Sequence, residues 1–268
     1  NAPPGNWTIV RIGYTPTGSV TQAAPDNGKG LECDKFSKQA MTFHFEKMME
    51  KLHPLVKSLA AKGKFGMEID SYEAGAQNWT PGFEQEFEKR CGYSPIKFLL
   101  VLAGGRIINS ADVSERFAWD LRRVQAELMA ENYYGHFCDL CKQHGFISYI
   151  EPYDSGPMEE MQIGSKADVA MGEFWYGIST AFPVENPVKR TPRLAASITH
   201  INGRQVAGAE AFTAEPDASR WMEYPFALKG LGDKAFATGI NRLIIHRFAH
   251  QPHPAAAPGM TMGPWGIH

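Results

Sequence analysis

The sequence of 268 residues carries almost no net charge and contains no long hydrophobic run. Its 27 basic residues nearly balance 29 acidic ones, so the formal charge at pH 7 is -2. Without an excess of one sign, no overall field attracts nucleic acid or an anionic membrane surface. No hydrophobic stretch approaches the roughly 20 residues that a membrane-spanning helix needs. We therefore expect neither nucleic acid nor a membrane among the partners of the chain.

The signatures of several common enzyme classes are also missing. No serine lies in a Gly-x-Ser-x-Gly turn, which argues against the usual α/β-hydrolase arrangement. There is no P-loop, and the segment from Gly13 to Gly18 does not fit the Gly-x-Gly-x-x-Gly turn of dinucleotide-binding proteins. His246 and His250 have a His-x-x-x-His spacing, but they lack the glutamate of a zinc-protease helix. Residues 1–6 have neither the basic start nor the apolar core of a signal peptide, which leaves the compartment open.

Cysteine is scarce, with four in the chain. Only Cys138 and Cys141 form a Cys-x-x-Cys pair, and they fall late in a predicted helix. One pair without a second is a weak zinc signal, because a structural zinc takes four ligands. We interpret both as reduced cysteines on a helix face, with a pair of zinc ligands as the alternative.

Five segments repeat one pattern, in which an apolar run leads to an acid or an imidazole beside an aromatic residue. The pattern occupies residues 65–73, 146–153, 167–175, 205–213 and 241–248. Apolar runs without alternation are typical of strands covered on both faces, as in a parallel sheet. An unpaired carboxylate is too costly to bury, so each acid is expected at the end of its strand, where a ligand reaches it.

These segments and a further predicted strand at 7–14 alternate with predicted helices. The alternation implies an α/β fold with a parallel sheet. Polar residues at the C-terminal strand ends match the active face of a (β/α)8 barrel. The helices are expected at 34–59, 81–90, 112–144, 158–163, 193–202 and 225–238, and Pro54 should kink or split the first of them.

Six predicted strands are two fewer than a closed barrel of this type requires. We therefore expect residues 1–268 to form one TIM-barrel-type catalytic domain that is incomplete, with about six βα units. An open doubly wound sheet is the alternative. Long loops at 14–31 and 71–83 are expected at the active site, since such loops are more often functional than connecting. Residues 250–268 read as an irregular tail.

The side chains at these strand ends are mainly carboxylates and aromatic rings. Such a set suits glycoside hydrolysis, in which one carboxyl group protonates the leaving oxygen and another activates water or attacks the sugar. It also suits a hard cation such as calcium, which takes several oxygen ligands. A structural ion pair is the alternative for the acids of the first pattern. The acidic and imidazole candidates are Glu68, Asp70, Glu73, Glu151, Asp154, Glu173, Glu210, His246 and His250.

Longer motifs carry a resemblance to a known family. They are residues 68–80, 132–137, 151–153, 171–175, 209–213, 248–252 and 258–265, which together span nearly the whole chain. In these motifs the sequence resembles glycoside hydrolase family 106, the bacterial α-L-rhamnosidases. The resemblance implies a (β/α)8 catalytic domain, an inverting mechanism and a calcium ion that helps to hold the rhamnose hydroxyls.

The resemblance also implies roles for single residues and a substrate. Glu210 is similar to the general acid of the family and Glu73 to its general base, while Glu173 falls where a calcium ligand is expected. The expected substrate is a rhamnose-containing oligosaccharide, polysaccharide or glycoside. The residues expected to bind it are Asp70, Glu151, Tyr153, Asp154, Trp175, His246 and His250.

Members of that family are far longer than this chain, with barrel strands upstream and accessory β domains. The resemblance thus implies part of a catalytic domain, from a bacterial periplasmic or extracellular protein. Two other functions stay open. One is a non-catalytic sugar-binding or inactive piece of a barrel. The other is a metal-dependent hydrolase that uses His246, His250 and the acids, in which imidazole ligands would favour zinc over calcium.

Overall fold

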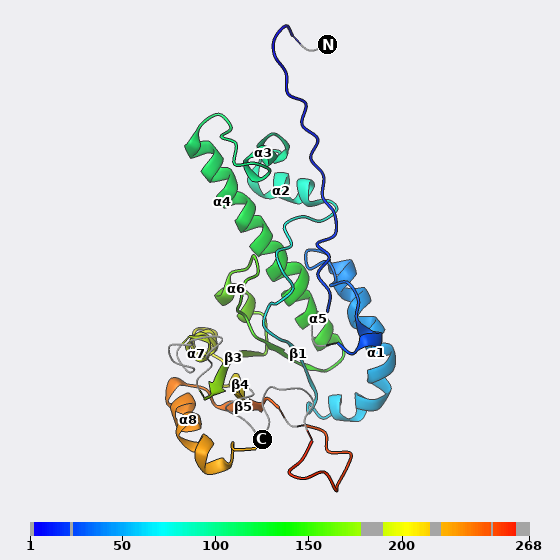
Figure 1. Ribbon diagram of the computed structural model, residues 1–268, viewed down its shortest axis with the longest axis vertical. Helices are drawn as coiled ribbons and strands as arrows, with labels where there is room; N and C mark the ends of the chain where they lie inside the picture. Colours follow the sequence, from blue (N-terminus) through cyan, green and yellow to red (C-terminus); the bar gives the residue numbers. More distant parts are fainter. Residues whose placement is uncertain (1–2, 22–23, 178–189, 215–220, 248, 261–268) are drawn as a thin grey trace.

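The computed structural model describes residues 3–21, 24–177, 190–214, 221–247 and 249–260. At its centre, the strands lie side by side in chain order and curl into a partial barrel (Figure 1). Each neighbouring pair of strands is parallel, as the alternating pattern predicted. The strands formed by the described residues are β1 (Gly66–Ile69), β2 (Ile147–Ile150), β3 (Val169–Tyr176), β4 (Ala207–Ala214) and β5 (Arg242–Ile245).

Helices connect consecutive strands, because a parallel strand begins only after the chain has returned to the same end of the sheet. Short 3₁₀ turns lie at Asp26–Gly28 (η1) and Ile96–Phe98 (η2). The longer helical elements are α1 (Lys38–Ala60), α2 (Phe83–Cys91), α3 (Leu99–Leu102), α4 (Ala111–Leu128), the π-helical segment η3 (Met129–Gly135), α5 (His136–Gln143), α6 (Glu160–Gly164), α7 (Thr191–Ile201) and α8 (Pro225–Thr238).

The long helix predicted at 112–144 is present as α4, η3 and α5, which follow one another without a break. Ser110 caps its start, because the hydroxyl of Ser110 accepts a hydrogen bond from the N–H of Val113 at 3.2 Å. Gly145 follows its end with a φ of 72°, a conformation that glycine adopts without steric cost. Cys138 and Cys141 lie in α5 as free thiols, with Cys141 buried in the core.

The prediction that Pro54 kinks or splits the first helix is wrong as to the split, because α1 continues through Pro54 to Ala60. A proline inside a helix removes one hydrogen bond, so packing must hold the helix on both sides of it. Met41, Phe45 and Met49 form a buried stripe before Pro54, and Leu52 and Val56 pack against the same core on either side of the proline.

The predicted strand at 7–14 is wrong, so the sheet of the described residues has five strands and not six. This segment is extended but runs away from the sheet, past α2 and α3 (Figure 1). Its apolar side chains are exposed, with Ile9 at 96% and Trp7 at 63%. Apolar, β-branched residues favour a strand only where a neighbour takes up their hydrogen bonds, and the described residues supply none here.

β3 and β4 are longer than predicted. Glu173 and Glu210 were expected at strand ends, but each lies inside its strand, with three residues of β3 and four of β4 beyond it. Small and buried residues such as Ala211 and Ala214 allow β4 to continue. The two acids therefore project from the middle of adjacent strands, where they are held more rigidly than loop residues.

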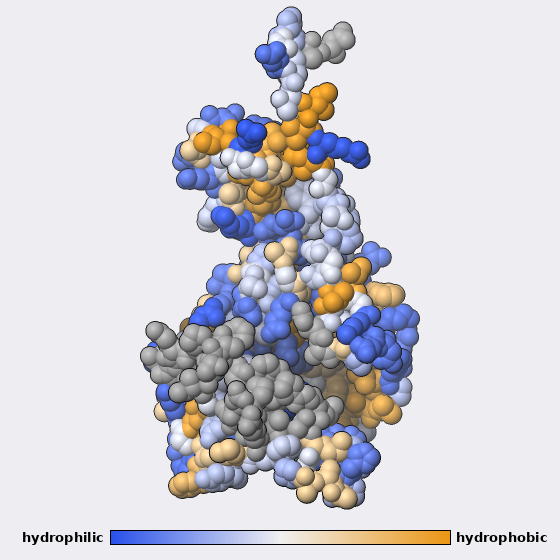
Figure 2. Space-filling view, in the orientation of Figure 1, coloured by the Kyte–Doolittle hydropathy of each residue, from blue (hydrophilic) through white to orange (hydrophobic). Residues whose placement is uncertain are grey.

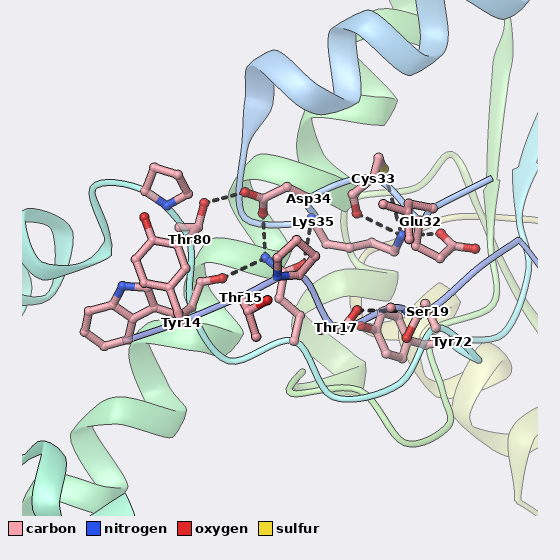
Figure 3. Close-up of a pocket in the computed structure, with 17 residues that line it drawn as sticks. Tyr14, Thr15, Thr17, Ser19, Glu32, Cys33, Asp34, Lys35, Tyr72 and Thr80 are labelled. Atoms are coloured by element: carbon pink, nitrogen blue, oxygen red, sulfur yellow. Dashed lines mark hydrogen bonds and ion pairs between the residues drawn. The ribbon is translucent and has the colours of Figure 1, made fainter. Parts of the chain in front are cut away.

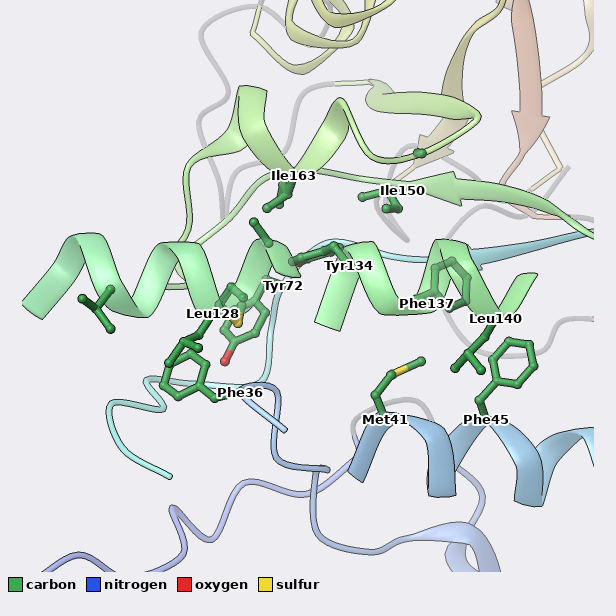
Figure 4. Close-up of a cluster of buried hydrophobic side chains, with 14 of the residues drawn as sticks. Phe36, Met41, Phe45, Tyr72, Leu128, Tyr134, Phe137, Leu140, Ile150 and Ile163 are labelled. Atoms are coloured by element: carbon green, nitrogen blue, oxygen red, sulfur yellow. The ribbon is translucent and has the colours of Figure 1, made fainter. Parts of the chain in front are cut away.

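The main core lies between α1, the long helix and the first two strands (Figure 4). Phe45 from α1 and Phe137 from α5 meet edge to face, with ring centroids 6.3 Å apart. Tyr134 from η3 and Ile150 from β2 are fully buried in the same cluster. This core therefore packs the helices against one face of β1 and β2.

A second, alanine-rich core packs α7 and α8 against β3 and β4. Small side chains such as Ala207 and Ala209 let the helices approach the sheet closely. Gly172 in β3 is the tightest point, because a Cβ there would lie 2.4 Å from the carbonyl carbon of Thr191. Only glycine fits, and the start of α7 therefore lies directly beside Glu173.

Hydrophobic side chains also gather on the surface of the upper part of the molecule, over α2, α3 and the start of α4 (Figure 2). Ile107 and Trp119 are 68% and 63% exposed there. Within the described ranges, no helix has both the length and the hydrophobicity to cross a bilayer.

Two phenylalanines of α1 test which face of this helix is buried. Phe45→Ala removes a ring with 0% exposure and should lower the free energy of unfolding by about 3–5 kcal/mol. Phe43→Ala removes a ring that is 66% exposed and should change it by less than about 0.5 kcal/mol. Urea denaturation followed by circular dichroism measures both, and equal losses would contradict the packing of α1.

Candidate active site

Carboxylates from four adjacent strands meet at the C-terminal end of the sheet. Glu68 lies in β1, with Asp70 just after it, and Glu151 directly follows β2. Oxygen atoms of these three side chains lie within 4.8 Å of one another. Glu173 in β3 and Glu210 in β4 are register partners, so their side chains leave the sheet on the same face.

Backbone pairing continues beyond β1 and β2 and holds the first group together. The N–H of Glu151 donates to the carbonyl of Ile69 at 3.0 Å, and the N–H of Tyr72 donates to the carbonyl of Tyr153 at 3.1 Å. The N–H of Ser71 donates to Oε2 of the Glu151 carboxylate, also at 3.0 Å. The chain after β1 is therefore attached to the chain after β2 at the site itself.

Glu73 lies further along the loop that follows β1 and is exposed. The hydroxyl of Ser71 donates to its Oε1 at 3.3 Å. Asp154 occupies the corresponding position after β2, pairs with Tyr72 in an isolated bridge and has a φ of 90°. A positive φ is uncommon outside glycine and is found preferentially at functional sites.

Glu173 is positioned by the start of α7. The hydroxyl of Thr191 accepts from the N–H of Glu173 at 2.9 Å and donates to its carbonyl at 3.0 Å. The indole N–H of Trp175 donates to Oε2 of Glu173 at 3.2 Å. Thr191 thus binds both the N–H and the carbonyl of Glu173. Trp175, an aromatic residue of the predicted strand pattern, orients the carboxylate.

Glu210 is the first member of a hydrogen-bonded row with Thr213 and His246. The hydroxyl of Thr213 donates to Oε1 of Glu210, and Nδ1 of His246 lies 3.0 Å from the same hydroxyl oxygen. Nδ1 is 3.6 Å from Oε1 of Glu210. Because one hydroxyl carries one proton, the row requires His246 to donate from Nδ1 when Thr213 donates to Glu210.

A bulge in β4 makes this row possible. In a regular strand, residues three apart point to opposite faces, so Thr213 would face away from Glu210. The register against β3 shifts between Phe174 and Trp175, which leaves Phe212 as the extra residue of β4. Phe212 has a φ of 66°, rare for an aromatic residue. The bulge returns Thr213 to the face of Glu210.

The predicted site residues are not all brought together. Tyr153 is 3% exposed beside Glu151, whereas His250 is exposed and has no described hydrogen bond or ion pair to the acids. Oε1 of Glu151 and the hydroxyl of Tyr153 are buried and influence each other's pKa, although neither makes a hydrogen bond of ordinary geometry. Sequence reasoning missed Thr191 and Thr213, since no local pattern marks a threonine whose partner is created by a bulge or by a distant helix.

A family model described as alpha-L-rhamnosidase matches residues 1–268. The chain belongs to glycoside hydrolase family 106, the alpha-L-rhamnosidases. The solved rhamnosidase from Novosphingobium sp. PP1Y has a similar fold, with 30% sequence identity and a TM-score of 0.81. That match covers 93% of this chain and 24% of the solved one.

A curated relative bears a different name. A protein of Formosa agariphila called "Putative beta-glucuronidase" is 42% identical over 260 residues, which cover 97% of this chain and 21% of that protein. The matched part of the chain therefore covers less than a quarter of the length of each relative. What those whole proteins do reaches this chain only as a proposal.

Burial raises the pKa of four carboxyl groups in this rhamnosidase-family site, those of Glu68, Glu151, Glu173 and Glu210. It raises the pKa of Glu173 and of Glu68 to about 7, and the neighbouring carboxylate of Glu210 adds to both shifts. Glu68 is still exposed to solvent, whereas Glu151 is 1% exposed. The loss of hydration therefore raises the pKa of Glu151 more than that of Glu68. The pKa of Glu151 is accordingly well above its ordinary value, raised by burial and then by Glu210 and Asp70.

Burial likewise raises the pKa of Glu210, although the hydrogen bond from Thr213 lowers it in part. Asp70 and Glu73 raise it further, which places both near enough to act on Glu210. The pKa of His246 is lowered, mainly by burial and then by Arg247. The lowered pKa favours the neutral imidazole, whose Nδ1–H tautomer can donate to Thr213.

These shifts predict how stability depends on pH. Acids whose pKa is higher in the folded than in the unfolded protein bind more protons when folded, so stability falls as pH rises from about 4.5 to about 7. Each such carboxyl contributes at most about 1.4 kcal/mol per pH unit. Glu173→Gln should make the decline shallower, and Glu115→Gln, an exposed residue of α4, should not. Urea unfolding in chelator between pH 4.5 and 8 measures this, and stability that rises over that range would contradict it.

Proposed function

We propose that this chain is catalytic and hydrolyses terminal α-L-rhamnosyl residues of oligosaccharides, polysaccharides or glycosides, with inversion at the anomeric carbon. The observation that carries the proposal is the Glu210–Thr213–His246 row at the end of a carboxylate-lined sheet, in a chain of the rhamnosidase family. Inversion needs an acid and a base on opposite faces of the sugar, with carboxyls roughly 6.5–9.5 Å apart.

Glu210 has the properties of a general acid. Its raised pKa favours the protonated form, which proton donation to a leaving oxygen requires. Thr213 and His246 accommodate both protonation states. When Glu210 is ionised, Nδ1 of His246 donates to the hydroxyl of Thr213, and that hydroxyl donates to Glu210. When Glu210 is protonated, the hydroxyl of Thr213 is free to donate to Nδ1 of the other neutral tautomer of His246.

Glu73 is proposed as the general base. It is exposed, so it reaches a water molecule, and Ser71 orients its carboxylate. Its charge raises the pKa of both Glu210 and Glu173, which supports a role for Glu73 near the acid. In this role Glu73 takes a proton from water as the water attacks the anomeric carbon, and Glu210 gives its proton to the departing oxygen.

The charge of the site favours a neutral sugar over a uronic acid. Among the described residues, no Lys or Arg forms an ion pair with Glu68, Asp70, Glu151, Glu173 or Glu210. The carboxylate of a glucuronide would enter a group of like charges, whereas rhamnose carries none. A glucuronidase, the activity in the name of the Formosa relative, is the second candidate.

The donors also fit a calcium ion. Glu68, Asp70 and Glu151 offer oxygen atoms within 4.8 Å of one another, and the buried Oε1 of Glu151 lacks a hydrogen-bond partner. Of the described residues, no histidine or cysteine belongs to such a group, which favours calcium over zinc. We propose that these three residues hold the ion, and Glu173 remains a predicted ligand beside them. When bound, the ion would hold and orient hydroxyl groups of the sugar.

Glu210→Gln separates leaving-group protonation from the rest of catalysis. It should reduce kcat on a rhamnosyl disaccharide by about 10²–10⁴-fold, and by less on p-nitrophenyl α-L-rhamnoside, whose leaving group needs little protonation. Glu73→Gln should reduce the rate on both. Glu115→Gln is the matched surface control.

Three outcomes would count against the proposal. The first is full activity of Glu210→Gln on the disaccharide. The second is proton NMR that detects α-L-rhamnose as the first anomer released. The third is faster hydrolysis of p-nitrophenyl β-D-glucuronide than of p-nitrophenyl α-L-rhamnoside.

Calcium should stabilise the folded chain. At about 100 times the dissociation constant, a specifically bound ion raises the free energy of unfolding by about 2.7 kcal/mol. Glu151→Gln should lose most of this gain, and Glu115→Gln should keep it. Thermal unfolding with calcium, magnesium or chelator measures the effect, and Glu173→Gln reports whether that residue is a ligand. Equal stabilisation of Glu151→Gln and the unchanged chain would rule out the three-carboxylate site.

A further inference from the structure

A second cavity, of about 390 Å³, adjoins the acid-lined site (Figure 3). Residues 14–19, 31–35 and the loop 72–81 contribute its walls. A cavity of about 340 Å³ beside β1 contains Glu68, Asp70 and Glu73, and the two cavities share Glu32, Lys35 and Tyr72 as walls. The loop that carries Glu73 therefore borders both cavities.

We propose that this second cavity binds the sugar unit to which the cleaved rhamnose is attached. The proposal rests on the proposed function, since it names the leaving-group side of the same substrate. It predicts a preference for rhamnosides whose leaving group is a neutral sugar. Three features of the cavity support it: a fixed aromatic platform, a wall of hydroxyl groups and the absence of an unpaired charge among its described residues.

Trp79 forms the platform. One side of its ring packs on the buried Phe83, with centroids 4.5 Å apart. Its backbone is held from two directions, because Gln77 Nε2 donates to the carbonyl of Trp79 at 3.3 Å and Gln125 Nε2 donates to that of Asn78 at 3.0 Å. The ring remains partly exposed. An immobile aromatic ring with one free face can stack on the apolar face of a sugar without losing rotamer freedom.

Tyr14 extends this platform. Its ring lies 6.4 Å from that of Trp79 at an interplanar angle of 38°, and the residue is 60% exposed. The two rings are thus neighbours at contact distance and form one continuous aromatic surface. Because Tyr14 is exposed, a sugar can stack on this surface from the cavity.

Hydroxyl groups from the segment 15–19 line the other side of the cavity. Thr15, Thr17 and Ser19 all contribute to its surface. The segment is seated on the loop after β1, because a Cβ at Gly75 would lie 3.0 Å from the hydroxyl of Ser19. The N–H of Glu32 donates to the carbonyl of Ser19 at 2.9 Å, which closes the wall at its base. Hydroxyls that both donate and accept match the hydroxyls of a sugar.

The charged groups of the cavity are already paired. Asp34 accepts from the N–H of Phe36 at 2.9 Å, from Gln77 Nε2 at 2.5 Å and from the hydroxyl of Thr80. Lys35 is 3% exposed and donates to Glu32 at 2.6 Å. Because Lys35 is bound to Glu32, it is not left to pair with a phosphate or a uronate, and the carboxylate of Asp34 repels such anions. The cavity therefore favours a neutral ligand.

Substrates with and without a second sugar test the proposal. α-L-Rhamnosyl fluoride has a single-atom leaving group, and rhamnosyl-(1→2)-, (1→4)- and (1→6)-glucose place a neutral hexose in the second cavity. Trp79→Ala and Tyr14→Ala should lower kcat/KM about tenfold or more on the preferred disaccharide and leave the fluoride unaffected. Trp79→Phe should recover part of the loss. Trp119→Ala, on an exposed ring of α4 outside the cavity, is the control.

The outcomes separate this inference from the proposed function. Unchanged disaccharide kinetics in both variants, or an equal loss on the fluoride, would overturn the second sugar site. Tyr14 is exposed, so Tyr14→Ala keeps the test valid if Trp79→Ala fails to fold. If the unchanged chain hydrolyses neither substrate, the proposed function fails. In that case the binding of the disaccharides is measured by calorimetry. Binding that is weaker in Tyr14→Ala than in the unchanged chain would support the second sugar site. No binding, or equal binding by both, would refute it.

Discussion

Mutual repulsion among carboxylates is the constraint on which the rest of this site depends. Glu68, Asp70, Glu151, Glu173 and Glu210 converge at one end of a sheet, and no described Lys or Arg neutralises them. Burial and like charge raise the pKa of several of these groups, so the fold supports them at a cost. Two packed cores behind the sheet supply the stability that offsets this cost.

Glu173 and Glu210 are each positioned by a feature that the local strand pattern does not contain. Thr191 at the start of α7 fixes the backbone of Glu173, and Gly172 permits that approach. The bulge at Phe212 aligns Thr213 with Glu210. Such backbone irregularity is retained where a site needs a side chain on the other face. The geometry is therefore built before any ligand arrives.

The two cavities beside β1 differ in charge. One contains Glu68, Asp70 and Glu73, which form no described ion pair with Lys or Arg. The acids of the other, Glu32 and Asp34, already have close partners, with aromatic rings and hydroxyls between them. The loop that follows β1 borders both, because Tyr72 separates them and Trp79 lies in the second. A metal ion or a polar reacting group suits the first cavity, and a neutral sugar suits the second.

Local patterns in the sequence determined the βα alternation, the parallel sheet, the long helix that ends at Gly145 and the strand ends where acids gather, because hydrophobic period and glycine stops act within a few residues. They also led to the family through long motifs. They failed for residues 7–14, whose strand pattern has no partner among the described residues, and for Glu173 and Glu210, which lie inside their strands. The partners of the acids were decided by the three-dimensional structure. Thr191 and the backbone of Ser71 bond to segments distant in sequence, which leaves no periodic trace in the chain, and Thr213 reaches Glu210 only because of the bulge at Phe212.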